Sequence, residues 1–446
     1  MGRKLNIMLW VVALGFFMQT LDTSIVNTAL PSMAQSLGES PLHMQAVVFS
    51  YSLMMAVMVP ASGWLADRFG TQRIYLFAIC VFTIGSLFCA ASPNLTFLIC
   101  SRAIQGFGGS MMLPVGRLAV LRNFPGDGFL PAMSIVTVAG LVGPLMGPTL
   151  GGLLCEVASW HWIFLINIPV GLAGATATLA YMPNDRLIGV ERFDVIGYFL
   201  LAVAMLASSL SLDGFEGGLT PMTTALAFAG ALSLFVYIRY AMTAASPLFN
   251  LRIFSITSFR IGLSGNFFAR LGNSAMPYLL PLFMQTCMGY SPLRAGMMLL
   301  PSTIAGMLAK NPATRLIQRC GYRRILVINT TLVGAAMASF TLLKEDAPTW
   351  ELSILMLFFG AVNSIQFTAM NTFTLKDLPE RDAGSGNSML SIVQMLALGI
   401  SVVIATIMLG VFQGAFSAEN LPAAFHAAFA FIGVITAMSS AIFSRA

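Results

Sequence analysis

The chain has 446 residues, of which 57% are hydrophobic and 9% are charged, and its formal net charge is +6. Because soluble domains carry about 25% charged residues, this composition excludes a soluble globular protein and indicates a polytopic membrane protein. The six cysteines have no CxxC spacing and the three histidines lie far apart. We therefore expect no disulfides, no metal site and no cofactor.

Apolar windows separated by turn or charge signals predict fourteen membrane-spanning helices, and hence an all-α membrane protein. The predicted spans are 7–33, 45–65, 74–92, 96–121, 130–156, 162–182, 195–213, 221–241, 257–287, 293–311, 323–343, 350–374, 386–412 and 422–443. The first window follows Arg3 and Lys4, as in a signal peptide, but it is too long and lacks a small-x-small cleavage site. We expect a retained first helix.

The distribution of basic residues predicts the orientation in the membrane. With the N-terminus inside, most of the 23 Lys and Arg residues fall in short inner loops, whereas acids such as Glu39, Glu345 and Glu419 fall outside. A bias of basic but not acidic residues is the positive-inside rule. Because the number of spans is even, both termini are predicted to be cytoplasmic.

An internal repeat groups the predicted spans. Residues 67–74 (DRFGTQRI) match residues 318–325 (QRCGYRRI), and residues 121–125 (LRNFP) match 375–379 (LKDLP), at equivalent topological positions. The repeat predicts two pseudo-symmetric six-helix bundles with two extra central helices between them. The predicted domains are therefore 1–184, 185–245 and 246–446, with a substrate site where the two bundles meet.

The first span contains Asp22, the one acidic residue that cannot be placed in a loop or at the end of a span. An ionisable side chain at mid-membrane costs about 2.5–3.5 kcal/mol on insertion scales, so it usually lines a protein interior or a watery path. Two interpretations are open: Asp22 snorkels to the outer interface, or it is a proton- or cation-coupling carboxylate. Gln19 and Asn27 flank it and are assigned to the substrate cavity.

The fourth span must include Arg102, because the uncharged run 103–116 is too short to cross about 30 Å. Snorkelling of its side chain would relieve part of the cost. Gln105, three residues later, is assigned to the substrate cavity.

Arg270 lies ten residues, or about 15 Å, beyond Arg260 and so falls near the midplane of its span. It is predicted to meet an anionic substrate, to pair with Asp22, or to bind backbone carbonyls. Four further polar residues are assigned to the substrate cavity, with interhelical hydrogen bonding as an equal alternative: Asn273, Asn363, Gln366 and Gln394.

The loop between the second and third spans carries Gly63, Asp67, Arg68, Gly70 and Arg73. A generic inner loop would explain the arginines but not the whole set, which resembles the hallmark gating loop of the major facilitator superfamily. The resemblance implies that Asp67 pairs with Arg73, or with a neighbouring helix N-terminus, and latches the outward-facing state.

A degenerate second copy of this gating loop contains Arg319, Gly321 and Arg324. It has Gln318 where the first copy has its acid, and this departs from the family's latch.

The fifth span holds two prolines and four glycines, which favour a bent helix with a close neighbour. These residues are Gly143, Pro144, Gly147, Pro148, Gly151 and Gly152. Their spacing resembles the antiporter motif of exporters in the same superfamily, and it implies a hinge that limits proton leak. The segments around Asp22 and Arg102 resemble the fourteen-span drug:proton antiporter branch, which implies that both residues belong to the proton-coupling system.

The resemblance covers essentially the full chain and implies proton-coupled antiport that exports small amphipathic compounds by alternating access. An exporter of a specific metabolite or organic anion is the alternative. We expect no enzyme, because no nucleophile–base or metal constellation is present. The expected partners are a small-molecule substrate, protons and the lipid bilayer, with no nucleic acid, and the protein is expected as a monomer in the bacterial inner membrane.

Overall fold

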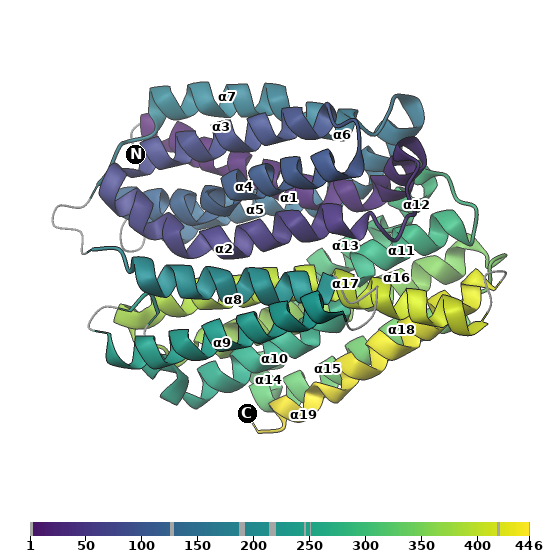
Figure 1. The fold of residues 1–446 in the computed structure, drawn as a ribbon. Helices are drawn as coiled ribbons and strands as arrows, with labels where there is room; N and C mark the ends of the chain where they lie inside the picture. Colours follow the sequence, from purple (N-terminus) through teal and green to yellow (C-terminus); the bar gives the residue numbers. More distant parts are fainter. Residues whose placement is uncertain are drawn as a thin grey trace. The chain divides into compact units, whose positions relative to one another are not determined.

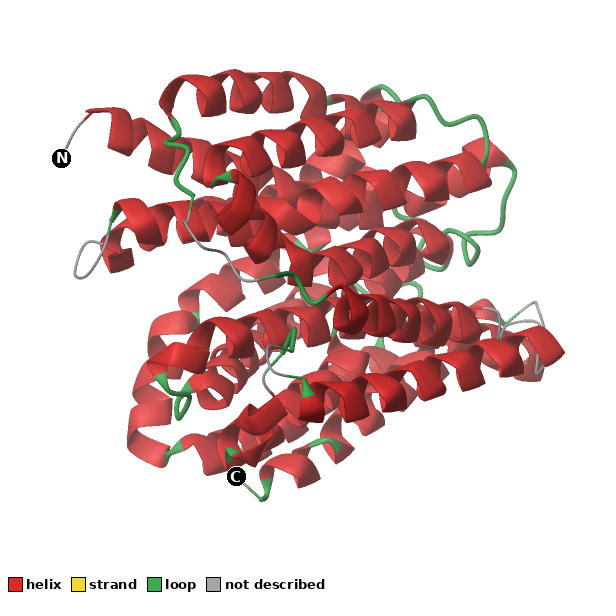
Figure 2. Cartoon of the chain, turned by 60° about the vertical axis from the view of Figure 1, so that its left-hand side comes forward, coloured by secondary structure: helices red, strands yellow, loops and turns green. Residues whose placement is uncertain are grey.

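The computed structural model describes residues 3–124, 129–186, 192–213, 220–244, 247–249, 251–416 and 420–445, apart from some side chains within these helices. Every regular element in these ranges is a helix (Figures 1 and 2). The helices are α1 (Arg3–Leu37), α2 (Gln45–Phe69), α3 (Thr71–Ala90), α4 (Leu95–Asn123), α5 (Phe129–Val157), α6 (Trp162–Leu165), α7 (Asn167–Tyr181), α8 (Val195–Asp213), α9 (Pro221–Thr243), η3 (Leu251–Ser255), α10 (Thr257–Asn273), α11 (Met276–Thr286), α12 (Pro292–Met298), α13 (Leu300–Leu308), α14 (Lys310–Cys320), α15 (Tyr322–Ser339), η4 (Phe340–Leu342), α16 (Thr349–Leu375), α17 (Glu380–Phe416), α18 (Leu421–Met438) and α19 (Ser440–Phe443).

Each of the fourteen predicted spans falls on one helix or on consecutive helices, so the all-α prediction is confirmed. Nine helical stretches in the described ranges are long and apolar enough to cross a membrane by themselves. The span predicted at 257–287 is divided into α10 and α11. The division precedes Pro277, which has no N–H to donate to the backbone carbonyl four residues earlier. The structure is thus consistent with fourteen spans, several of them interrupted.

The chain forms two compact units, Met1–Phe199 (unit 1) and Leu200–Ala446 (unit 2). Helix α8, the first of the two predicted inserted helices, contributes residues to both units because the boundary lies within it. The division into 1–184, 185–245 and 246–446 stays a prediction.

In unit 1, α1 packs along α5, while α4 packs against both α2 and α3. The glycines of α5 permit the first contact. A Cβ atom on Gly151 would lie 2.6 Å from the carbonyl oxygen of Ile25, and one on Gly143 would lie 2.6 Å from the amide nitrogen of Leu21. Helices α1 and α5 are therefore closer than any larger residue at these positions allows.

In unit 2, α15 packs against α18 and α16, and α10 packs against α16 and α17. An aromatic cluster supports this arrangement. The ring of Phe429 lies 5.6 Å from that of Phe283 and 5.8 Å from that of Phe340, and all three side chains are fully buried. Such aromatic pairs stabilise a core beyond their buried area.

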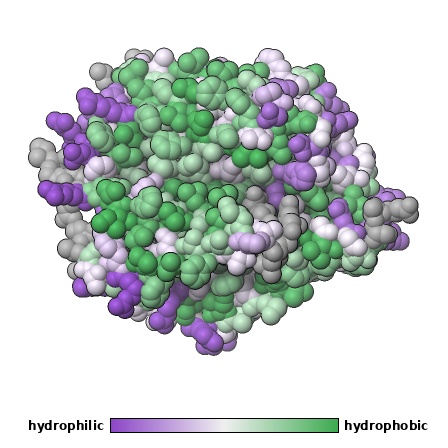
Figure 3. All heavy atoms as spheres, viewed as in Figure 1, coloured by the Kyte–Doolittle hydropathy of each residue, from purple (hydrophilic) through white to green (hydrophobic). Residues whose placement is uncertain are grey.

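The exposed helix surfaces carry large apolar side chains, among them Leu172 and Leu179 of α7 and Phe228 and Phe235 of α9. In the view of Figure 3, hydrophobic residues cover the middle of the helices and hydrophilic residues gather toward their ends. This distribution fits helices whose middle faces hydrocarbon and whose ends face water.

Candidate functional site

A buried ion pair lies at the centre of unit 1. Arg102 of α4 donates from Nη1 to Oδ2 of Asp22 on α1, over 2.7 Å, and the two side chains are 1% and 0% exposed within the structure. The interpretation that Asp22 snorkels to the interface is therefore wrong for this structure, and Arg102 does not snorkel either. An ion pair removed from water persists only when its geometry and remaining hydrogen bonds are satisfied.

Two amides complete the surroundings of the Asp22 carboxylate. Gln105 donates from Nε2 to Oδ1 of Asp22 over 2.8 Å, and Asn167 donates from Nδ2 to the same oxygen over 3.1 Å. Both amides also donate to Oγ of Ser86, and Arg102 donates to Oε1 of Gln105. Side chains from α1, α3, α4 and α7 thus form one polar network, which we call the Asp22 network: Asp22, Ser86, Arg102, Gln105 and Asn167.

Aromatic rings enclose the cation of this network. The guanidinium carbon of Arg102 lies 4.2 Å from the ring centroid of Tyr51 and 5.7 Å from that of Phe164. Its Nε also donates to the backbone oxygen of Val47 over 3.3 Å. Cation–π contacts of desolvated arginine reach about 2 kcal/mol, so these rings help to hold the charge in an apolar environment.

Three polar residues assigned to the substrate cavity lie in unit 1. Gln105 is fully buried in the Asp22 network, whereas it was assigned to the substrate cavity. Gln19 donates weakly to the sulfur of Met55, at 4.0 Å, and Asn27 donates to the carbonyl of Thr23 at 3.4 Å. The amide oxygens of Gln19 and Asn27 are buried and have no hydrogen-bond partner among the described residues. These two oxygens are unsatisfied acceptors of α1.

Arg270 lies in unit 2, on α10. Its Nε is 3.4 Å from Oδ1 of Asn266, and its guanidinium carbon is 4.8 Å from the ring centroid of Phe367. Its Nη2 is buried without a hydrogen-bond partner in the described part of the chain. Among the described residues, Arg270 hydrogen-bonds a side-chain amide oxygen in place of a backbone carbonyl. Asp22, its other predicted partner, is bound by Arg102.

The other polar residues of unit 2 bind one another across helix contacts. Asn273 donates to Asn363, and Gln394 donates to Asn371 over 2.9 Å. Gln366 is 1% exposed: it accepts from Asn329 at 3.0 Å and donates to Thr330 at 2.6 Å. For these residues the structure favours the interhelical alternative, and Gln366 in particular does not face a cavity.

The gating loop has a different ion pair from the predicted one. Asp67 pairs with Arg122, in the last turn of α4, and not with Arg73, whose side chain is exposed. Arg122 also donates to the backbone oxygen of Asp185 over 2.9 Å. The prediction of an Asp67–Arg73 pair is thus corrected. Arg122 lies where α4 ends, close enough to reach both the loop and the segment after α7.

Gly70 allows this arrangement. Its φ of +99° is in the region that favours glycine, and a Cβ atom there would collide with the side chain of Asn184. The other predicted members of the loop lie toward the surface: Gly63 is half-buried, and Arg68 is exposed, 5.5 Å from the ring centroid of Trp64.

The second copy of the loop repeats the backbone but not the ion pair. Gly321 has a φ of +78°, matching the positive φ of Gly70. Arg319 and Arg324 are exposed, and Gln318 replaces the acid. The turn geometry is shared by both copies, whereas the charge pairing belongs to the first.

The predicted hinge lies on α5, beside the segment of α1 that carries Asp22. Ser24 donates from Oγ to the carbonyl of Gly143 over 3.2 Å, and a Cβ on Gly147 would collide with the same serine. Pro144 is exposed, while Pro148 and Gly152 are buried. Despite both prolines, α5 is one helix from Phe129 to Val157. These residues form a close contact with α1, and their hinge role stays a prediction.

Sequence reasoning missed Ser86, Asn167 and Arg122. Asn167 had a weak signal, since it is an amide within an apolar span. Ser86 had none, because isolated serines are common in membrane helices. Arg122 was used only as a basic residue of an inner loop and as part of the repeat of residues 121–125.

Comparison with known proteins identifies the family. The model of the Major Facilitator Superfamily matches residues 12–402 and 262–445. A "Putative multidrug resistance protein MdtD" from Serratia proteamaculans (strain 568) is 49% identical over 443 residues, covering 98% of this chain and 92% of that protein. A protein of the same name from Pectobacterium atrosepticum is 49% identical, covering 98% and 95%.

Solved transporters share the fold at low sequence identity. A POT family transporter in complex with 5-aminolevulinic acid has a TM-score of 0.71 at 15% identity, over 99% of this chain and 95% of that chain. A mutant of the nucleoside transporter NupG has a TM-score of 0.62 at 17% identity, over 98% and 99%. From the family model, the relatives and the fold together, the chain belongs to the Major Facilitator Superfamily of multi-pass membrane transporters.

Proposed function

We propose that the protein is a proton-coupled antiporter that exports small amphipathic compounds. The observation that carries the proposal is the buried Asp22–Arg102 ion pair within a membrane-spanning bundle. Ionisable side chains inside the membrane commonly mark proton relays and ion pathways. The names of the relatives, which describe multidrug resistance, support amphipathic cargo.

Protonation of Asp22 would couple the proton to the conformation of unit 1. The ionised carboxylate accepts from Arg102, Gln105 and Asn167, and a neutral carboxyl would leave the Arg102 cation without a counter-charge. Removing one partner of a buried pair is strongly destabilising, so the protonated network favours a different arrangement of α1 and α4. In the proposed cycle, Asp22 takes a proton from the outer side and releases it to the cytoplasm, helped by Arg102 or by the cargo. The membrane potential adds about 2.3 kcal/mol per charge per 100 mV.

The test is transport by the full chain in proteoliposomes with an imposed pH gradient, using ethidium among a panel of amphipathic cations. Asp22→Asn should abolish gradient-driven transport while retaining exchange of labelled for unlabelled cargo, since the amide cannot cycle a proton. Asp346→Asn, which removes an exposed carboxylate, is the matched control and should transport normally. Gradient-driven transport by Asp22→Asn at the rate of the unsubstituted chain would refute the coupling role.

Export of an organic anion is a second candidate, and the free Nη2 of Arg270 among the described residues favours it. A guanidinium with an unused buried donor suits a carboxylate or phosphate. If the cargo is anionic, Arg270→Gln should abolish its transport. The control, Arg294→Gln, removes a cation that lies beside the ring of Tyr290 and should leave transport intact.

We also propose the membrane, the orientation and the oligomeric state of the protein. We place it in the bacterial inner membrane as a monomer, with both termini in the cytoplasm. The positive-inside bias of the sequence supports this orientation.

A further inference from the structure

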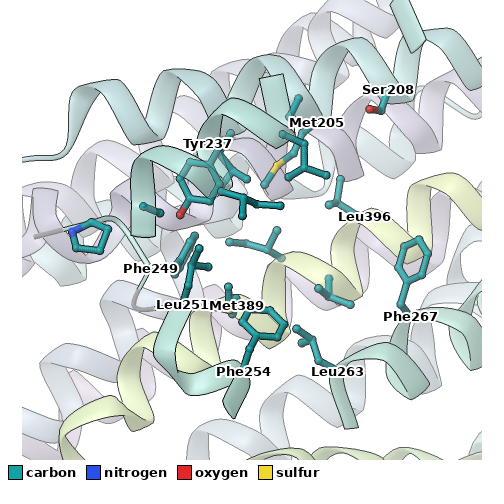
Figure 4. A pocket seen from close by; sticks show the side chains of 18 of the residues that line it. Met205, Ser208, Tyr237, Phe249, Leu251, Phe254, Leu263, Phe267, Met389 and Leu396 are labelled. Atoms are coloured by element: carbon teal, nitrogen blue, oxygen red, sulfur yellow. The ribbon is translucent and has the colours of Figure 1, made fainter. Parts of the chain in front are cut away.

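Unit 2 contains a cavity of about 1180 Å³ whose lining residues all belong to that unit. The walls come from α8, α9, α10 and α17, together with η3 and the segment that joins α9 to it. In Figure 4, Met205, Tyr237, Phe249, Met389 and Leu396 surround one shared space. None of the residues predicted to contact cargo lines it. The cavity is therefore lined by other residues than those predicted to contact cargo.

The lining is almost entirely apolar along the helices. Polar groups are few: Ser208 and Ser209 of α8, Tyr237 of α9, and the cation Arg252 of η3. On α17 the lining extends from Met389 to Ile400, which is about 16 Å along a helix. That depth equals about half of the 30 Å hydrocarbon core, or one leaflet of a bilayer.

The charge lies at one end of the cavity. Arg252 is exposed, and it stands in the connection between α9 and α10. The chain from Arg239 to Arg260 contains three arginines and no acid. Leu375 and Leu378 pack in the same core cluster as Phe254, and between them Asp377 pairs with Lys376 at 3.8 Å, so the basic residues remain in excess. In the proposed topology this end faces the cytoplasm. The cavity thus combines an apolar lining about one leaflet deep with basic residues at its cytoplasmic end.

We propose that this cavity binds an anionic phospholipid of the cytoplasmic leaflet, with its acyl chains between α8, α9, α10 and α17 and its phosphate at Arg252. Basic pockets between membrane helices on the cytoplasmic side bind anionic headgroups. The volume exceeds the roughly 300–1,000 Å³ of ordinary small-molecule sites, which favours a two-chain lipid. The lipid would fill the space between the inserted helices α8 and α9 on one side and α10 and α17 on the other.

The experiment is native mass spectrometry of the purified full chain, released from nanodiscs of equal parts phosphatidylglycerol and phosphatidylcholine. The unsubstituted chain should retain phosphatidylglycerol in preference to phosphatidylcholine. Arg252→Gln should lower that preference about five-fold, the contribution of one basic residue at an anionic surface. Leu396→Trp should fill the cavity and lower retention of both lipids.

Matched controls separate the site from general effects. Arg294→Gln removes a cation outside the cavity, and Leu232→Trp adds an indole to α9 at an exposed position that does not line it. Both should retain lipid as the unsubstituted chain does. Circular dichroism melting of each variant confirms folding, and Met205→Trp serves as a second filling variant if Leu396→Trp does not fold.

Several results would overturn the proposal. These are retention of phosphatidylcholine and phosphatidylglycerol in equal amounts, an unchanged preference in Arg252→Gln, and unchanged retention in the filling variants. Displacement of the lipid by tetraphenylphosphonium, a cation without phosphate, would instead assign the cavity to cargo. Because binding is measured without a gradient, the result does not depend on the coupling role of Asp22.

Discussion

Arg102 lies 2.7 Å from Asp22, on a helix 80 residues away in sequence, and neither side chain reaches the surface of its unit. Each charge is the main compensation for the other. The stability of unit 1 should therefore depend on the pair as a whole more than on either member.

Arg102→Met is expected to destabilise the protein by about 3–5 kcal/mol, because it leaves a buried carboxylate uncompensated. Combining it with Asp22→Asn should recover most of that loss. The measurement is a double-mutant cycle of unfolding in detergent, with urea or heat as the denaturant. Additive losses in the double variant would contradict a direct interaction.

Gly151→Ala should destabilise the contact between α1 and α5 by about 1–3 kcal/mol, the usual cost of overpacking. The new methyl group would meet the carbonyl oxygen of Ile25, which cannot move without shifting α1. Gly410→Ala in α17 is the control, because nothing lies within 4 Å of a Cβ atom there. That variant should be neutral or stabilised by up to about 1 kcal/mol, from helix propensity. Equal thermal shifts in the two variants would mean that the contact is looser than described.

Arg122→Gln and Asp67→Asn should have similar effects on transport rate and melting temperature, and the double variant should add little. The pair is partly exposed, so we expect about 1 kcal/mol or less from it. Arg73→Gln should have the smaller effect, since that side chain is exposed and Asp67 pairs elsewhere. If Arg73→Gln matched Asp67→Asn while Arg122→Gln were silent, the family latch would be the better description.

A topology reporter tests the orientation that the lipid proposal uses. Alkaline phosphatase fused after Asp213, where α8 ends, should be active and hence external. The same enzyme fused after Ala244, beyond α9, should be inactive because it stays in the cytoplasm. The opposite pattern would reverse the proposed sidedness.

The helices could be predicted from the sequence because each span is a long apolar window, and such windows have few alternatives in a membrane. The positions of Asp22 and Arg102 inside spans could be predicted as well, since both interrupt apolar runs. Their pairing was not predicted: family resemblance placed both residues in the proton-coupling system, and Arg270 was the arginine considered as a partner for Asp22. The two residues lie 80 positions apart and meet because α1 packs against α4, and a hydropathy profile does not predict which helices pack together.

The remaining errors share one cause. Gln105 was assigned to the substrate cavity, and Gln366 to that cavity or to an interhelical hydrogen bond, because an amide in a span must find partners and the sequence does not say whether those partners are water or another helix. Thr330 and Asn329 provide them for Gln366. Likewise, several basic residues near Asp67 were candidate ion-pair partners. Arg122 is its partner because α4 ends beside the loop that carries Asp67.

The seam between α1 and α5 has a mechanical consequence. At Gly143 and Gly151 its glycines let α5 approach backbone atoms of α1, and at Gly147 the glycine faces the side chain of Ser24. The opposite side of α1 is bound to α4 through Asp22. We therefore expect a movement of α1 that follows a change of charge on that carboxylate to shift α5 as well, because the two helices are in close contact.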